Sequence, residues 1–133
     1  MREIKEIIIH CSATPLGKDF SAEVIRDWHV KGNGWDDIGY HFIIRLDGTI
    51  EYGRMVDKQG AHCKGHNRDS IGIAMAGGTE NGKPVFNFTR TQMLTADNLA
   101  KHLSELYNAG IHGHNEFSSK ACPSFDVKEW FYG

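Results

Sequence analysis

Histidine and cysteine are the residues of this chain whose types and spacing could support chemistry, with eight histidines and three cysteines among 133 residues. His10 follows the apolar run 7–9 and opens into a loop, and loops held by rigid elements commonly carry sites. Farther along, His112 and His114 precede Cys122, and the loop between them is short enough to bring a histidine and the thiol to one point. With His10, these residues predict two imidazoles and one thiolate around Zn²⁺, with a fourth position left for water, as in zinc hydrolases.

The spacing leaves alternatives open. His112 and His114 point to the same face of a strand, so periodicity does not choose between them. Cys11 should point to the face opposite His10, where packing is its expected role, since a free cysteine is often a small buried hydrophobe. A single histidine is more often hydrogen-bonded or solvated than a ligand. We expect such structural or solvated roles for His29, His41, His66 and His102.

Composition limits the classes of protein to which this chain can belong. Fifteen Lys and Arg against seventeen Asp and Glu give a net charge of −2, which argues against a nucleic-acid binder with its basic face. The 40% hydrophobic and 24% charged fractions exclude a largely disordered chain. An odd cysteine count and adequate length argue against a disulfide scaffold. No apolar run is long enough for a signal peptide or a membrane span, so we expect synthesis in the cytoplasm without membrane insertion.

The elements that must position these residues alternate between strands and helices. Apolar runs and turn signals predict strands over 6–10, 40–45, 49–52, 70–76 and 111–114, with turns at Asp47-Gly48 and Asn81-Gly82. A loop is expected over 11–20. The Asp47-Gly48 hairpin makes the sheet mixed rather than purely parallel. The sequence therefore predicts an α/β fold, a mixed β-sheet flanked by helices, in a single domain over 1–133.

Three helices are expected beside this sheet. Ser21 should cap the first, with Val24, Ile25 and Trp28 on one face. Thr89 and Gln92 form a capping box before a long helix that should stop at Gly110. Its expected apolar stripe is Ala96, Leu99, Ala100, Leu103, Leu106 and Tyr107. A last short helix is expected over 127–131.

Five motifs together resemble the zinc-dependent N-acetylmuramoyl-L-alanine amidases, in the phage amidase-lysozyme branch of the type 2 amidase and peptidoglycan recognition protein superfamily. They are Ile9-His10-Cys11-Ser12-Ala13-Thr14, Gly39-Tyr40-His41-Phe42-Ile43-Ile44, Asp47-Gly48-Thr49, the segment 67–72, and Lys120-Ala121-Cys122-Pro123-Ser124-Phe125-Asp126. The resemblance runs in the same order from Ile7 to Trp130. It implies a sheet with a zinc cleft at one edge and hydrolysis of the amide between the lactyl group of N-acetylmuramic acid and L-alanine of the stem peptide.

The resemblance also implies the site residues. By matching motif, His10, His114 and Cys122 hold one Zn²⁺ per chain, which selects His114 over His112. Some relatives carry Asp at the last ligand position, so Cys122 marks the phage-lysozyme and recognition-protein branch. A segment that lines the cleft in the family contains His62, which becomes a substrate-binding candidate.

Tyr40 and Lys120 match the two catalytic side chains of the branch. Lys120 stands two residues before Cys122, and its ammonium is a good partner for a tetrahedral intermediate. The Tyr40 phenol can hydrogen-bond the water or the oxyanion, or pass a proton to the leaving amine. The division of these tasks stays open. Without the resemblance, Tyr40 would be interpreted as a core aromatic on the face of Phe42 and Ile44, and Lys120 as a solvated charge.

Other functions stay open beside an endolysin-like enzyme that lyses cell walls. One is a non-catalytic muropeptide-binding module, although such members of the superfamily typically lack a ligand. Another is a regulator of phage RNA polymerase, which uses an N-terminal arm, and only nine residues precede His10. A purely structural zinc site would need a fourth ligand, and none is evident. We expect a monomer with no separate wall-binding domain, which binds peptidoglycan and no nucleic acid and reaches the wall after release from the cytoplasm.

Overall fold

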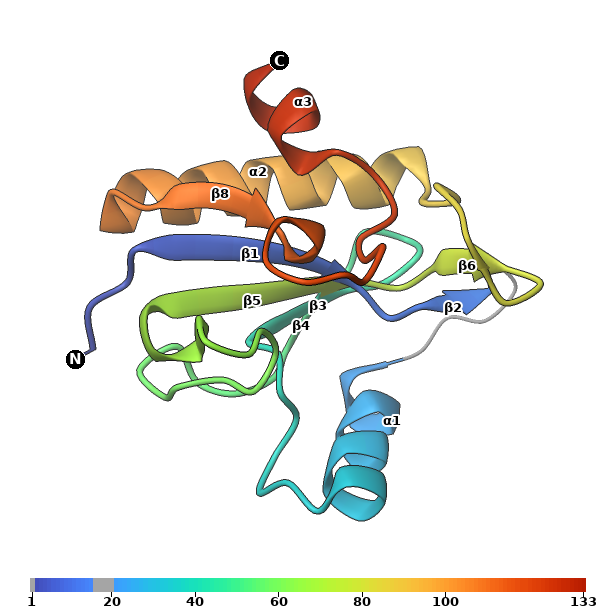
Figure 1. The fold of residues 1–133 in the computed structure, drawn as a ribbon, viewed down its shortest axis with the longest axis horizontal. Coiled ribbons are helices and arrows are strands. Elements are labelled where there is room, and N and C mark those ends of the chain that lie inside the picture. Colours follow the sequence, from blue (N-terminus) through green and yellow to red (C-terminus); the bar gives the residue numbers. More distant parts are fainter. Residues whose placement is uncertain (1, 16–20) are drawn as a thin grey trace.

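The computed structural model describes residues 2–15 and 21–133, and its main sheet has five strands in the order β4-β3-β5-β1-β8 (Figure 1). β1 pairs in parallel with both β5 and β8, β3 is parallel to β5, and β3 is antiparallel to β4. The predicted mixed sheet is therefore confirmed. The strands span Glu6–Cys11 (β1), Phe42–Ile44 (β3), Ile50–Tyr52 (β4), Ser70–Met75 (β5) and Gly110–Gly113 (β8).

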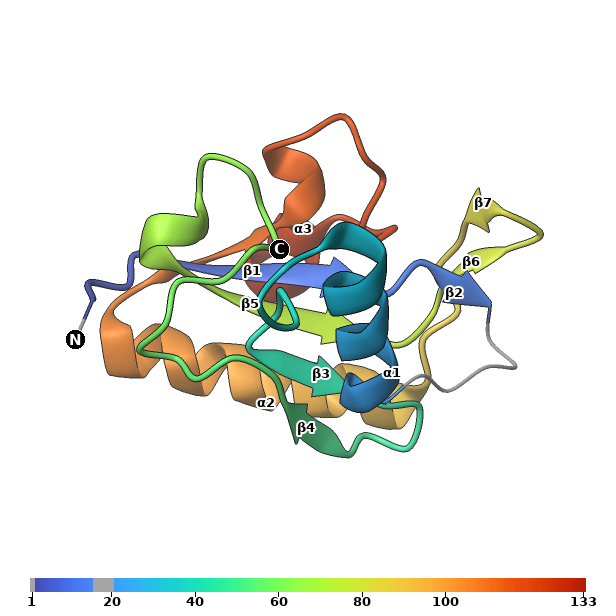
Figure 2. The same cartoon turned by 90° about the horizontal axis from the view of Figure 1, so that it is seen from below.

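The two faces of this sheet are covered by different helices. Phe42 and Ile44 join the larger apolar cluster with residues of α2 (Arg90–Tyr107) and α3 (Val127–Tyr132). Ile43 points the other way, to a smaller cluster with α1 (Ala22–Asp27). Figures 1 and 2 show α1 and α2 on opposite sides of the sheet. The central strands β1 and β5 are buried on both faces, which explains their nearly continuous apolar sequences.

Local capping signals gave the helix starts correctly. The Ser21 hydroxyl accepts the backbone N–H of Val24 at 3.3 Å and caps α1. Ile25 is buried as expected, but Val24 and Trp28 are 38% and 42% exposed. The predicted apolar face of this helix is thus wrong in part. Trp28 belongs to a π-helical turn over Trp28–Gly32 (η1), which follows α1 and changes the rotation per residue.

The long helix α2 begins with the predicted capping box. The Thr89 hydroxyl accepts the N–H of Gln92 at 3.1 Å, and the Gln92 side-chain oxygen accepts the N–H of Thr89 at 2.9 Å. Ala96, Ala100 and Leu103 of the predicted stripe are buried, whereas Leu106 is 62% exposed. The helix ends at Tyr107, and Asn108 takes the left-handed conformation with φ 53°. Gly110 instead begins β8, so the predicted stop was two residues late.

A small second sheet lies beside the ends of the central strands, in the order β2-β6-β7 (Figure 2). Its strands span Thr14–Pro15 (β2), Gly78–Glu80 (β6) and Lys83–Pro84 (β7), and the predicted turn at Asn81-Gly82 joins the last two. The loop expected over 11–20 is interrupted by β2, and its part over 16–20 lies outside the described residues. Two 3-10 turns, η2 (Asn67–Asp69) and η3 (His114–Glu116), complete the elements. In the described ranges, no helix has the length and apolar character needed to cross a bilayer.

Candidate active site

The register between two parallel strands brings His10 and His114 together. β1 and β8 pair so that Ile9 lies opposite Gly113, and His10 and His114 are the next residues along each strand direction. Their ring centroids lie 4.5 Å apart. His112 lies opposite Ile8 instead, where its Nδ1 is 3.1 Å from a Glu116 carboxylate oxygen. The structure thus places His114, and not His112, beside His10.

Cys122 completes the cluster from the loop before α3. The ligand atoms of His10, His114 and Cys122 all lie within 4.8 Å of one another. The Cys122 sulfur is 3.9 Å from Nδ1 of His10 and accepts the backbone N–H of Cys11 at 3.1 Å. Ligands that each lie about 2.0–2.3 Å from one zinc ion stand at such separations. The Cys11 side chain lies in the hydrophobic core, as expected from its place on the strand.

The protonation states of these groups suit a metal. Burial, followed by electrostatic repulsion that protonated His10 would meet from His62, His114 and Lys120, holds the pKa of His10 well below its usual value. Burial and then Lys120 also lower the pKa of His114. Both rings are therefore neutral imidazoles at neutral pH, the form that binds zinc.

The thiols of Cys11 and Cys122 influence each other. Their mutual hydrogen bond lowers the pKa of Cys11 to about 7. The same contact, together with burial, raises the pKa of Cys122. A divalent cation beside Cys122 would reverse this preference, because a coordinated thiol loses its proton. Two imidazoles and one thiolate form a donor set that fits Zn²⁺.

Tyr40 borders this cluster, 5.1 Å from His10 between ring centroids. The predicted strand was too long at this end, since β3 begins at Phe42. Tyr40 packs against the smaller apolar cluster and not on the face of Phe42 and Ile44, because the chain leaves strand geometry before it reaches residue 40. Burial raises the pKa of the Tyr40 phenol, so it keeps its proton near neutral pH and can donate a hydrogen bond.

Lys120 is exposed and lines the same cleft. Its positive charge acts on His10, His114 and Cys122, lowering the pKa of each of the two imidazoles. Its ammonium forms no ion pair with the described residues, so its charge is available to a substrate. An exposed cation beside two neutral imidazoles is suited to stabilise negative charge that develops in the cleft.

His62 lies behind His10 with both ring nitrogens in hydrogen-bond contact with the protein. Its Nδ1 is 2.8 Å from Nε2 of His10, and its Nε2 is 3.2 Å from the Ser70 hydroxyl. The residue is 9% exposed. Burial first, and then nearby positive charge, lowers its pKa to about 3, so the ring is neutral. The substrate contact that the resemblance implies for His62 stays a prediction.

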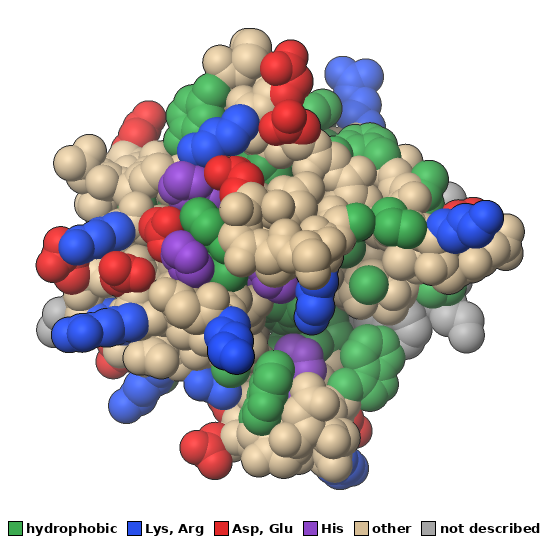
Figure 3. Space-filling model, viewed as in Figure 1, with side chains coloured by type: hydrophobic (Ala, Val, Ile, Leu, Met, Phe, Trp, Pro, Cys, Tyr) green, Lys and Arg blue, Asp and Glu red, His purple; other side chains and the backbone are tan. Residues whose placement is uncertain are grey.

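The cleft has a volume of about 690 Å³ and contains Tyr40, His62, His114 and Lys120 in its walls. Its outer wall includes His29 and Trp35, whose rings lie 4.7 Å apart. Trp35 carried no sequence signal for a site, and His29 was expected only in a structural or solvated role, since no local pattern shows that the segment after α1 lies against this cleft. Figure 3 shows several histidine side chains at the surface of one face, with Lys or Arg side chains close by.

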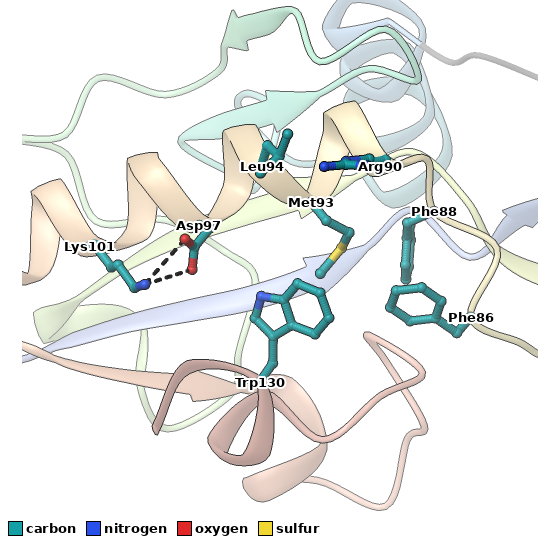
Figure 4. Close-up of a pocket in the computed structure, with 8 residues that line it drawn as sticks. All are labelled: Phe86, Phe88, Arg90, Met93, Leu94, Asp97, Lys101 and Trp130. Atoms are coloured by element: carbon teal, nitrogen blue, oxygen red, sulfur yellow. Dashed lines mark hydrogen bonds and ion pairs between the residues drawn. The ribbon is translucent and has the colours of Figure 1, made fainter. Parts of the chain in front are cut away.

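A second hollow of about 590 Å³ lies elsewhere, between the start of α2, α3 and the segment before α2 (Figure 4). Trp130 points from α3 toward Met93, and Phe86 and Phe88 close one end. Its charged groups are Arg90 and the ion pair of Lys101 with Asp97, at 3.1 Å. These walls hold no histidine or cysteine, so hydrolytic chemistry is supported by the first cleft and not by this one.

Comparison with known proteins agrees with this geometry. The family model described as N-acetylmuramoyl-L-alanine amidase matches residues 1–125. An endolysin of Klebsiella phage KP32 is 45% identical over 132 residues, which cover 98% of this chain and 87% of the relative.

Solved structures give the same result. The N-acetylmuramoyl-L-alanine amidase LysC from Clostridium intestinale superposes with a TM-score of 0.82 at 30% identity, covering 97% of this chain and 85% of that chain. A mutant of the Drosophila peptidoglycan recognition protein LB, in complex with tracheal cytotoxin, superposes with a TM-score of 0.76 at 25% identity, covering 96% and 79%. The chain therefore belongs to the N-acetylmuramoyl-L-alanine amidase family.

Proposed function

We propose that this chain is a zinc-dependent amidase whose ion is held by His10, His114 and Cys122. Membership of the family supports the reaction, which is cleavage of the amide between the lactyl group of N-acetylmuramic acid and L-alanine in peptidoglycan. The observation that supports the metal site is the β1–β8 register, which sets two neutral imidazoles side by side with a thiol facing them. The donors match a catalytic zinc site with one open position.

The remaining side chains supply what such a site needs from the protein. Bound zinc would lower the pKa of a water and polarise the scissile carbonyl. Lys120 brings a positive charge to the negative charge that develops on the carbonyl oxygen. Tyr40 holds a protonated phenol at the inner wall, from which it donates a hydrogen bond to that oxygen or to the leaving amine. The apolar sheet beneath fixes the two histidines, because both follow buried strand positions.

Digestion of purified peptidoglycan with mass analysis of the products tests this function. We expect new L-alanine amino ends, which disappear with a chelator and return with zinc. His114→Ala should abolish the reaction, and His102→Ala, at an exposed position of α2, serves as the matched control that keeps it. New reducing sugar ends would instead identify a glycosidase and refute the proposal.

The setting of the reaction follows from the same family. Relatives named endolysin support an enzyme made inside the cell that reaches the wall after release. A complex of a related recognition protein with tracheal cytotoxin supports muropeptides as ligands of this cleft. We expect one catalytic domain that acts as a monomer, which sedimentation at several concentrations can test. Control of a phage RNA polymerase stays a prediction, to be tested by transcription with the purified chain present.

A further inference from the structure

His10 presents its two ring nitrogens to different partners. Nδ1 faces the Cys122 sulfur at 3.9 Å, whereas Nε2 lies 2.8 Å from Nδ1 of His62. A neutral imidazole carries one proton, and the nitrogen that binds a metal must offer its lone pair. If Nδ1 of His10 is the ligand atom, its proton is on Nε2 and is donated to His62.

A second hydrogen bond extends from His62 to Ser70. Because Nδ1 of His62 accepts from His10, the proton of the neutral His62 ring is on Nε2. That nitrogen lies 3.2 Å from the Ser70 hydroxyl, which can accept. The result is a chain of hydrogen bonds in one direction, from His10 to His62 to Ser70. Ser70 is fully buried, so the chain ends inside the protein and not in solvent.

The protein leaves the His62 ring little freedom. The Asn67 side-chain oxygen accepts the backbone N–H groups of both His62 and Cys63 at 2.9 Å. Glycine stands at two positions against the ring, and a Cβ added to either Gly60 or Gly72 would come within 2.7 Å of a ring carbon. The backbone and the ring of His62 are thus both fixed before any ligand arrives.

We propose that His62 is a positioning residue, which fixes the tautomer and ring orientation of His10 and so presents Nδ1 of His10 to the metal. The inference rests on the proposed zinc site and deepens it. Groups that hydrogen-bond a ligating histidine typically change metal affinity by about 10- to 100-fold. This positioning function differs from substrate binding, because both ring nitrogens of His62 are hydrogen-bonded to other side chains.

Zinc affinity of the full-length chain, measured by competition with a chromophoric chelator, tests this inference without reference to turnover. His62→Phe keeps a ring but removes the acceptor, and we expect its affinity to fall by about 10- to 100-fold. His62→Gln restores an acceptor and should recover most of the loss. Ser70→Ala leaves His62 in place and removes only its outer partner, so a smaller loss is expected.

Gln92→Ala is the matched control. Gln92 is also fully buried, and its side-chain amide donates to the Ala76 and Ile44 carbonyls, but neither partner is a proposed ligand or His62. This variant should lower stability with and without zinc and leave zinc affinity unchanged. Thermal unfolding of each variant in chelator and in excess zinc separates loss of fold from loss of metal. If His62→Phe fails to fold, His62→Gln and Ser70→Ala still give the graded comparison.

The outcomes separate this inference from the proposed function. Weaker zinc binding by His62→Phe with recovery by His62→Gln supports the inference, even if the unchanged chain does not cleave peptidoglycan. Equal zinc affinity of His62→Phe and the unchanged chain overturns it, even if the chain is an active amidase. A raised KM with unchanged zinc affinity would also overturn it, in favour of a substrate contact. If the unchanged chain binds no zinc, both ideas are wrong.

Discussion

Gly72→Ala is a one-methyl change that should disturb the candidate site from behind. Gly72 lies in β5 opposite Ile8 of β1, with no side chain between its backbone and the His62 ring. A Cβ at this position would stand 2.7 Å from Cγ and 2.8 Å from Nδ1 of His62, where ordinary contacts begin at 3.4 Å. The ring must therefore retreat by 3.4 − 2.7 = 0.7 Å, or the strand must shift.

Both responses lower the free energy of unfolding. A 0.7 Å displacement of the ring can stretch its 2.8 Å contact with His10 to 3.5 Å, beyond the usual range of a hydrogen bond. Gly60 limits retreat along the ring's other edge, since a Cβ there would stand 2.7 Å from Cδ2. Overpacking of this kind costs about 1–3 kcal/mol of unfolding free energy. For a chain of this length, the midpoint of thermal unfolding should fall by roughly 3–15 °C.

The assay is thermal unfolding in chelator and in excess zinc, together with zinc competition. We expect Gly72→Ala to lose stability in both conditions and to bind zinc about tenfold more weakly. Gly32→Ala is the matched control, because its added Cβ would meet no atom within 4 Å. If Gly72→Ala unfolds and binds zinc like Gly32→Ala, the packing of Gly72 against His62 is not what holds the site. Lost stability with unchanged zinc affinity would show that the orientation of His62 does not matter to the metal.

Four further predictions follow from the site and the core. Lys120→Ala should keep bound zinc but lower kcat by about 10²-fold or more; full activity, or loss of zinc by metal analysis, would contradict the assigned function of its ammonium. His114→Ala should lose zinc, whereas His112→Ala should keep it, since only His114 lies beside His10; equal zinc content in the two variants would refute the register argument. Burial lowers the pKa of His41 from 6.5 to about 4, so the unfolded chain binds a proton that the folded chain lacks between these values. The contribution of His41 to the free energy of unfolding is therefore fully present above pH 6.5 and is lost as the pH falls toward 4, a decrease of about 3 kcal/mol from this residue alone. Denaturant unfolding of the zinc-free chain should show this decrease, and the decrease should be smaller in His41→Gln. Gln92→Ala should cost about 2–4 kcal/mol, because the buried amide of Gln92 donates to the carbonyls of Ala76 and Ile44; a loss below 1 kcal/mol in urea titration would be inconsistent with this account.

Elements defined by local hydrogen bonds were predictable from the sequence. The Ser21 cap, the Thr89–Gln92 capping box and the Asp47-Gly48 hairpin each involve residues within a few positions of one another. Propensity and side-chain chemistry act over the same short range, so sequence pattern and structure agree there. The end of α2 was misplaced by two residues because Asn108, and not Gly110, takes the left-handed conformation. Asparagine tolerates that conformation, and the pattern alone does not rank the two residues.

The site was predictable only in part, because its residues are far apart in the sequence. His10 and His114 are adjacent because of the β1–β8 register, which joins segments more than a hundred residues apart. Without the family resemblance, periodicity left His112 and His114 equivalent, because both point to one face of a strand. The structure separates them through the end of the strand, where β8 gives way to η3 at His114. The internal partners of His62 depend on an irregular loop and had no sequence signal.

The three proposed ligands differ in how the fold secures them. His10 and His114 follow buried strands, so the sheet itself sets the distance between them. Cys122 lies on a loop, and a loop ligand needs tertiary ties to match that precision. Its sulfur accepts the Cys11 N–H at 3.1 Å, and two residues later the Ser124 hydroxyl donates to the Gly78 carbonyl at 2.9 Å. The small second sheet, which contains Gly78, therefore helps to hold the Cys122 thiol beside the two histidines.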